Sequence, residues 1–558
     1  MPQTDFTEEV SYILSSNSSN FPFALPPLGS LGTEIYNLML ELVAIPSVTG
    51  SDGEEDRCAR FIYERLSRLE YFKHNEKDLK LLPLAGDPLG RHSLLALVRA
   101  SRPTKKTIVL TGHFDVVDAE VCGPIRLWAF EPEEYTKRIA ELSIPEEARE
   151  DLESGNYIFG RGVADMKTGI AVDIVLLEEY ALQRERLDFN IMLLAVPDEE
   201  GDSTGMRGSV VSLVELQEEE GLDFLAMVNT EPVFESTTPA IYYGTIGKMM
   251  PLYLCVGRES HVGGYYEGLN STLIASYLNI SLDGAEDTIE SYGGETFQPQ
   301  CCLRMRDLRS RYAVTLPERT VVYYNCLTVE KTPAALLDEM KIKAKKALEK
   351  TLVHVGNVQW MPEVLTVEEL LRKASEMKKC TKDDLVREFL ECPRSVDERE
   401  RNIEFLSWIL DLTGEKGPLV LVGFVPPYYP PRNNGDRTVY ERGVRNAAHS
   451  TKDFLKKRGY AFEEIEIFQG ITDLSYTGFQ GDMKDIVPLA TNTPLWGYGY
   501  ELPLRELHRI DIPSVLMGPI GKDAHKITER VDLEFSFNIL PAAIKNFIES
   551  LVEYHNKS

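Results

Sequence analysis

Apolar and polar positions along the first 240 residues alternate in a way that predicts strands separated by helices. Four apolar runs bounded by turn-forming or charged residues predict strands: 93–100, 106–117, 189–200 and 225–232. Helical spacing of apolar residues predicts an opening helix at 33–50 and a long amphipathic helix at 165–185. Strands that alternate with helices form mostly parallel sheets covered on both faces, so we expect an α/β fold.

The pattern changes after Tyr243. A strand, a loop and a helix are predicted within 244–284, and a second strand and helix within 319–350. Further helical material, predicted over 352–416, precedes a strand and a proline-rich link at 419–434.

The last part returns to the earlier alternation. It has a helix at 438–459, a glycine-containing loop at 468–478, a strand at 513–521 and a final helix at 540–555. We therefore predict a catalytic domain in two parts, 1–243 and 431–558, with an α+β lid or dimerisation domain, 244–430, inserted between them.

Charge narrows the classes of partner. Asp and Glu number 88 against 60 Lys and Arg, a formal charge of −28, which argues against a nucleic-acid backbone or an anionic membrane. The first 20 residues lack a basic start followed by an apolar core, and no run approaches the roughly 18 apolar residues of a membrane helix. A cytoplasmic protein is expected.

The eight cysteines lack the paired spacing of a disulfide framework or a zinc ribbon. We predict buried free thiols, with the adjacent Cys301 and Cys302 used in packing.

Residues of the types that bind divalent metals follow the predicted strands. They are His113, Asp115, Asp165, Glu199, Glu200, Glu231 and His525. Imidazoles and carboxylates are suitable ligands for a pair of divalent cations, and strand ends of an open α/β sheet are where such sites form. The leading hypothesis is therefore a two-metal hydrolase.

Each part of this set also has a simpler interpretation. His113 and Asp115 project to the same side of a strand, where Asp115 could orient a metal-binding or an ordinary core histidine. Asp165 could bridge two cations or cap the helix that follows it. The triple acid 198–200 could supply a ligand and a general base, or be a solvated loop.

Several longer strings carry a family resemblance: TGHFDVVD, GRGVADMKTG, PDEEG, NTEP, GFVPPYYP, FQGITDLSY and GPIGKDAHKITERV. Together they resemble the aminoacylase, carboxypeptidase G and acetylornithine deacetylase family of dizinc metallopeptidases, and most closely its RocB-type arginine-utilisation hydrolases. The resemblance covers about residues 30–555. It implies the dizinc exopeptidase fold with an inserted lid.

The resemblance also implies a role for each site residue. One zinc would be bound by His113, Asp165 and Glu231, and the other by Asp165, Glu200 and His525. Glu199 would be the general base and Asp115 the partner of His113, and a cis peptide bond would follow Asp165.

Residues that contact the substrate are implied as well. His261 from the inserted domain would reach the substrate oxyanion, often in the partner subunit's site, and Asn270 would shape its loop or the dimer helix. Gly470, Thr472 and Asp473 resemble the substrate loop. The chain departs from the family in having no clear arginine for a substrate carboxylate; Arg304, Arg306 and Arg319 are the nearest.

The sequence thus predicts a metal-dependent hydrolase that cleaves an amide bond in a small N-acyl amino acid or short peptide. Its cofactors would be two divalent ions, zinc by preference, and it would form a homodimer through the inserted domain. The alternatives are a lid-less dizinc aminopeptidase and a non-catalytic metal- or ligand-binding protein that keeps the fold. The acyl group and the amino acid are not identified by the sequence.

Overall fold

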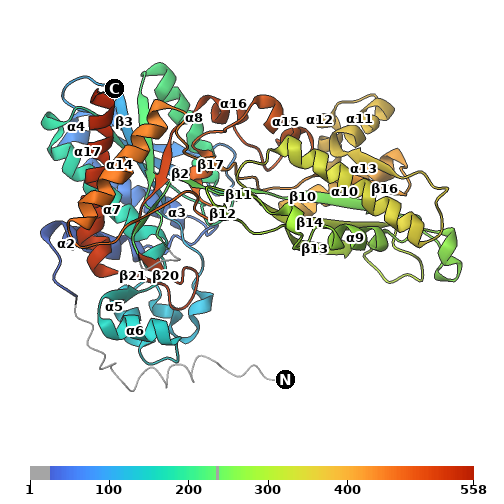
Figure 1. Ribbon diagram of the computed structural model, residues 1–558, viewed down its shortest axis with the longest axis horizontal. Helices are drawn as coiled ribbons and strands as arrows, with labels where there is room; N and C mark the ends of the chain where they lie inside the picture. The colour runs from blue at the N-terminus through green and yellow to red at the C-terminus, as the bar shows by residue number, and fades with distance from the viewer. Residues whose placement is uncertain (1–24, 234–237, 558) are drawn as a thin grey trace.

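The computed structural model describes residues 25–233 and 238–557, drawn in colour in Figure 1. Residues 1–20, where the sequence predicts no export signal, lie outside the described residues. Figure 1 shows a broad body that contains the C-terminus and an elongated body that extends from it. Within the two described ranges, no helix combines the length and the apolar character needed to span a membrane.

The broad body is built on an eight-stranded sheet whose order is β1-β2-β5-β3-β6-β19-β7-β18. These strands are β1 (Leu79–Pro83), β2 (His92–Val98), β3 (Lys106–His113), β5 (Asn190–Val196), β6 (Asp223–Asn229), β7 (Ala240–Tyr242), β18 (Glu463–Ile465) and β19 (Ser514–Leu516). The four central strands, β5, β3, β6 and β19, are parallel to one another, whereas β2 pairs antiparallel with β5 and β1, and β7 pairs antiparallel with β19. The predicted α/β class is confirmed.

Helices cover both faces of this sheet because successive strand residues point to opposite sides. On β3, Ile108 and Leu110 pack into one core, while Val109 packs into another. The first core includes α2 (Ser30–Val43), α3 (Glu54–Ser67), α7 (Thr168–Leu182), α14 (Val439–Lys456) and α17 (Leu540–Lys557). The second includes α8 (Thr204–Glu219) and part of α16 (Leu504–Arg509).

The prediction that α7 is amphipathic is wrong. Of its 15 residues, 13 are buried, because the helix lies between the sheet and α2 and has almost no solvent-facing side.

The elongated body contains a six-stranded sheet of order β13-β14-β10-β16-β15, with β9 also paired to β14. Its strands are β9 (Gly247–Met249), β10 (Pro251–Val256), β13 (Cys301–Asp307), β14 (Arg319–Thr328), β15 (Glu363–Thr366) and β16 (Leu419–Phe424). One face carries α9 (Ser271–Ile280) and α10 (Pro333–His354). The other carries α11 (Val367–Lys378), α12 (Lys382–Leu390) and α13 (Glu398–Thr413). The domain boundaries near 243 and 430 stay a prediction.

Short elements connect and extend the two bodies. The pair β8 (Gly244–Thr245) and β17 (Arg432–Asn433) joins the two links between them. Below the broad body, α5 (Pro132–Ile139) and α6 (Glu146–Ser154) lie against β4 (Tyr157–Phe159), β20 (Gly521–Lys522) and β21 (Arg530–Asp532), as Figure 1 shows. The other helices are α4 (Glu70–His74) and α15 (Met483–Thr491), and the other strands are β11 (Ser291–Tyr292) and β12 (Glu295–Thr296).

All eight cysteines are free thiols, as predicted. Four of them are buried: Cys58, Cys122, Cys255 and Cys326. The prediction of burial is wrong for Cys301 and Cys392, which are exposed. Cys301 lies on β13, an edge strand of its sheet, and none of the seven residues of this strand is buried.

Candidate metal centre

The candidate site lies where three parallel strands end. β3 ends at His113, β5 is followed by the acidic residues Asp198, Glu199 and Glu200, and β6 is followed by Glu231. Because the carboxyl ends of parallel strands meet at one edge of the sheet, side chains from distant parts of the sequence converge there.

Two sets of potential ligand atoms share Asp165. His113 Nε2 lies 3.0 Å from Asp165 Oδ1 and 3.5 Å from Glu231 Oε1. His525 Nε2 lies 3.2 Å from Asp165 Oδ2 and 2.8 Å from Glu200 Oε1. Within each set, one ligand atom per residue lies within 4.8 Å of the others, so each set could hold an ion. The two oxygens of Asp165 therefore face two different sets.

Asp115 connects the histidine to the acidic loop. The Nδ1 atom of His113 lies 3.0 Å from the carbonyl oxygen of Asp115 and 3.5 Å from its Oδ1. The Asp115 carboxylate also accepts hydrogen bonds from the backbone N–H groups of Glu199 (3.1 Å) and Glu200 (3.2 Å), and from the Thr49 hydroxyl (2.8 Å). Asp115 thus fixes both the imidazole and the start of the loop; sequence analysis missed the second role and Thr49.

Glu199 points toward the same centre. Its Oε2 lies 3.9 Å from His113 Nε2, and its side chain is 10% exposed. Burial raises the pKa of Glu199 well above its usual value, and the negative charges of Glu231 and Asp473 raise it further. A carboxyl group of this kind can exchange a proton with a neighbouring molecule.

The charges around the centre fit cations. Burial, together with the charge of Asp165, raises the pKa of Glu231 to about 8. Burial by itself would lower the pKa of His113, but the charge of Glu231 and hydrogen bonds with Asp115 and Asp165 raise it well above its usual value. Carboxylates this close need positive charge to be ionised together, and imidazole and carboxylate donors suit zinc and similar divalent ions. The residues present therefore fit two divalent cations.

The turn that carries Asp165 is held by two residues that sequence analysis missed. Glu529 Oε1 accepts hydrogen bonds from the backbone N–H groups of Ala164 (3.3 Å) and Asp165 (3.4 Å), and its other oxygen pairs with the buried Arg161. The available signal was that both residues lie within strings that carry the family resemblance, Arg161 in GRGVADMKTG and Glu529 in GPIGKDAHKITERV. The peptide bond between Asp165 and Met166 is cis, as the resemblance implied.

The predicted substrate loop lies partly at the centre. Asp473 is 2% exposed, and neither of its carboxylate oxygens has a hydrogen-bond partner among the described residues. Burial raises its pKa to about 7. Thr472 instead accepts a hydrogen bond from the Leu474 N–H (3.3 Å), and the Gly470 carbonyl accepts one from Thr245 (2.9 Å), so both shape the loop.

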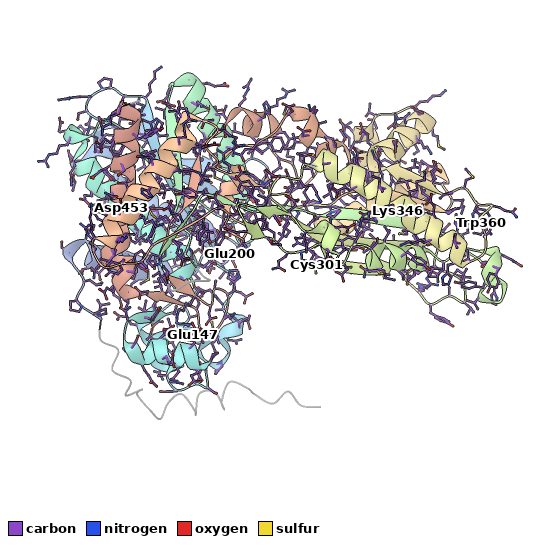
Figure 2. The ribbon with its side chains drawn as sticks, in the orientation of Figure 1. Glu147, Glu200, Cys301, Lys346, Trp360 and Asp453 are labelled. Carbon is purple, nitrogen blue, oxygen red and sulfur yellow. The ribbon has the colours of Figure 1, made fainter. Side chains whose placement is uncertain are left out.

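The structure does not bring His261 to the centre of its own chain. Its side chain is exposed, and its Nδ1 accepts the Gly263 N–H (3.1 Å). Three residues earlier, Arg258 stacks 4.8 Å from the ring centre of Trp360. Figure 2 shows Trp360 at the far end of the elongated body from Glu200.

The other predicted residues of the elongated body also have local partners. Asn270 accepts the Thr272 N–H (2.9 Å) and begins α9. Arg304 and Arg306 both pair with Glu400, and Arg319 pairs with Asp411. None of these contacts reaches the metal centre.

Comparison with known proteins identifies the family. The sequence profile of Peptidase family M20/M25/M40 matches residues 109–550. Uncharacterized protein YqjN of Bacillus subtilis (strain 168) is 32% identical over 541 residues, which cover 93% of this chain and 96% of that protein. Protein RocB of the same strain is 27% identical over 539 residues, 92% of this chain and 94% of RocB.

More distant relatives agree with this assignment. A succinyl-diaminopimelate desuccinylase of Psychrobacter arcticus is 25% identical over 325 residues, 57% of this chain and 70% of that enzyme. A tripeptidase from Staphylococcus aureus has the same fold with a TM-score of 0.51 at 15% identity, covering 94% of this chain and 99% of that one. The predicted family resemblance is confirmed: the chain is a hydrolase that belongs to Peptidase family M20/M25/M40.

Proposed function

We propose that this hydrolase uses two divalent metal ions to cleave an amide bond in a small N-acyl amino acid or short peptide. One observation carries the proposal: the two carboxylate oxygens of Asp165 face separate imidazole and carboxylate sets, with Glu199 beside them. These residues would hold two cations, which would supply the Lewis-acid chemistry needed for attack of water on an amide carbonyl.

The chain's own residues would divide the metal ligation. His113, Asp165 and Glu231 would hold one ion, and Asp165, Glu200 and His525 the other. Zinc suits this donor set. When bound, such ions polarise a carbonyl group and lower the pKa of water.

Glu199 would move the proton. Its carboxylate accepts a proton from the attacking water and returns it to the leaving nitrogen, so that the amine departs neutral. Burial raises its pKa, which makes the carboxylate a stronger base toward water. Asp115 would keep Glu199 in place, because it accepts the hydrogen bond of the Glu199 backbone N–H.

The substrate contacts would require a second copy of the chain. His261 is three residues from Arg258, which stacks on Trp360 at the far end of the elongated body in Figure 2. We therefore propose that His261 donates a hydrogen bond to the substrate oxyanion in the site of a partner, in a homodimer formed through the inserted segment. A positioned donor of this kind contributes about 2.7–4 kcal/mol. Asn270 would shape the segment that follows His261, while Gly470, Thr472 and Asp473 would line the substrate loop.

A role in arginine or amino-acid catabolism, in the cytoplasm, is the finer proposal. It is supported by the 27% identity to RocB over 92% of this chain. Deacylation is supported by the similarity to a succinyl-diaminopimelate desuccinylase.

Replacement of Glu199 tests the proposed function. The zinc-loaded protein and its Glu199→Gln variant would be assayed against N-acyl amino acids and dipeptides, and their zinc content measured. We expect wild-type turnover of at least one substrate, a loss of about 10²–10⁴-fold in the variant, and two zinc ions in both. Glu219→Gln, the same change at an exposed position on α8, is the control. Near-normal turnover by Glu199→Gln, or a wild type that binds no metal, would contradict the proposal.

A further inference from the structure

The helices α5 and α6 pack against the loop that carries His525. We propose that they clamp this loop and thereby position His525 toward Glu200 and Asp165. The inference rests on the proposed function, because it gives the helix pair a role in metal binding at that set. It makes Asp151 and Tyr135 positioning residues.

Asp151 on α6 is the first contact of this clamp. Its Oδ2 accepts hydrogen bonds from Arg530 Nε (2.7 Å) and from Lys522 Nζ (2.9 Å). The Asp151 side chain is 15% exposed, Lys522 is 11% exposed and Arg530 is 1% exposed, so these ion pairs are largely shielded from water. Because Lys522 and Arg530 stand on either side of His525, one carboxylate holds both ends of the loop.

Inside the loop, Asp523 extends the network toward the histidine. Asp523 Oδ2 accepts hydrogen bonds from Arg530 Nη1 (2.6 Å) and from the Thr528 hydroxyl (2.8 Å). Arg530 Nη1 also donates to the Thr528 carbonyl (3.0 Å). Asp151, Arg530 and Asp523 thus form a continuous chain from α6 to the residue two positions before His525.

The backbone of this loop needs such support. Asp523 has φ of 55° and His525 has φ of 65°, both in the left-handed region that non-glycine residues rarely adopt. Conformations of this kind are unfavourable and persist where the surrounding contacts impose them. The His525 side chain is 48% exposed, so its own packing contributes little to holding the ring in place.

Tyr135 on α5 makes the second contact. Its hydroxyl donates a hydrogen bond to the carbonyl of Ile527 (2.8 Å), and its ring belongs to the small core that α5 and α6 share. The side chain of Ile527 packs against the same core. Figure 1 shows α5 and α6 directly beneath β20 and β21, the strands that flank the loop. The loop is therefore held at its ends by Asp151 and in its second half by Tyr135.

Zinc titration of the metal-free, full-length protein against a chromophoric competitor tests the clamp. His525→Ala first identifies the binding phase that depends on His525. We expect Asp151→Asn and Tyr135→Phe each to weaken that phase, by about 10-fold or more for Asp151→Asn, since changes behind a ligand typically cost 10–100-fold in metal affinity. The other phase should weaken less, because His113 and Glu231 do not come from this loop. Glu150→Gln, the neighbouring exposed carboxylate on α6, should bind zinc as the wild type does.

The outcomes separate the clamp from the proposed function. Two wild-type phases that both variants leave unchanged would overturn the clamp and keep the proposed function. A wild type without zinc binding would overturn both. If Asp151→Asn does not fold, the zinc titration of Tyr135→Phe tests the clamp alone, because this variant keeps the ring and removes only one hydroxyl group. Equal weakening of both phases by Tyr135→Phe would also overturn the clamp, since it would indicate a general loss of structure.

Discussion

The two ligand sets of the candidate centre differ in how the fold supports them. His113 ends β3 and Glu231 follows β6, the adjacent parallel strand of the central sheet, and the two residues are 1% and 5% exposed. His525 is 48% exposed at its side chain and comes from a loop outside that sheet. We call His113, Asp165 and Glu231 the buried set, and Asp165, Glu200 and His525 the exposed set. A packed core fixes the buried set, whereas the exposed set depends on hydrogen bonds and ion pairs around one loop.

This difference shows how one candidate centre can combine a rigid ligand set with a set whose geometry can change more easily. Strands within a core move little, because close packing resists displacement. Loops held by a few polar contacts open at lower free energy. We therefore expect the exposed set to be the more sensitive to substitution outside the ligands and to competition for metal.

Removal of the shared ligand should have the largest effect. Asp165→Asn leaves one oxygen for two sets, so we expect loss of at least one zinc ion and a fall in kcat/KM of roughly a thousandfold, about 4 kcal/mol. Zinc analysis and kinetics check this. Asp173→Asn is a matched control: Asp173 is buried on α7, burial raises its pKa well above its usual value, and its contact is the Thr230 hydroxyl at 2.8 Å. Two bound ions and normal kinetics in Asp165→Asn would refute the shared role.

The two histidines should differ in their effect on stability without metal. The ring of His113 is buried between Asp165 and Glu231, so His113→Ala removes the basic group that these two buried carboxylates contact. We expect a loss of about 3–5 kcal/mol in the free energy of unfolding. His525→Ala should cost about 1 kcal/mol or less, because its ring is half exposed. Urea unfolding measures both; equal losses would show that burial does not separate the two sets.

Chelation should remove the two ions in order. The ion bound by His525 is open to water, so we expect a chelator to remove it first. Removal of the ion bound by His113 and Glu231 should need a free chelator concentration about 10-fold higher or more, since ligand support typically changes metal affinity 10–100-fold. Zinc content measured along the titration, with His525→Ala as the one-ion reference, checks the order. Simultaneous loss of both ions would contradict it.

Loss of the Thr49 hydroxyl should have the smallest effect. Thr49→Val removes one of the hydrogen bonds to the Asp115 carboxylate and keeps the shape of the side chain. We expect the binding free energy of zinc at the buried set to fall by about 1 kcal/mol, which is roughly a fivefold loss of affinity in a competition titration. Thr49→Ser, which keeps the hydroxyl, should restore the affinity; an equal loss in both variants would assign the effect to packing.

The central fold was predictable because long apolar runs mark β2, β3, β5 and β6. The three-residue strands β7 and β18 are too short to show a period, and the exposed edge strand β13 carries polar and charged residues that hide its alternation. α8 contains two glycines and several β-branched residues, which lower intrinsic helix propensity, so packing against the sheet determines its helical form.

The candidate site was predictable for the residues that follow strands and not for those that support them. His113 and Glu231 stand directly after apolar runs, so their convergence follows from the parallel sheet. Glu529, Asp151 and Thr49 act through contacts with residues far away in the sequence, and no local pattern encodes such contacts. His261 was predicted from resemblance alone, and its exposed position three residues from Arg258 depends on how the whole elongated body folds.

The order of the ligands along the chain has a consequence for biosynthesis. His113, Asp165 and Glu231 all leave the ribosome early, whereas His525 follows Glu200 by 325 residues. At about 5–20 residues per second, that interval is on the order of half a minute. A nascent chain could capture its first ion long before the residue that completes the second set exists, so a doubly loaded centre would mark a chain that has been synthesised at least through His525 and has folded around it.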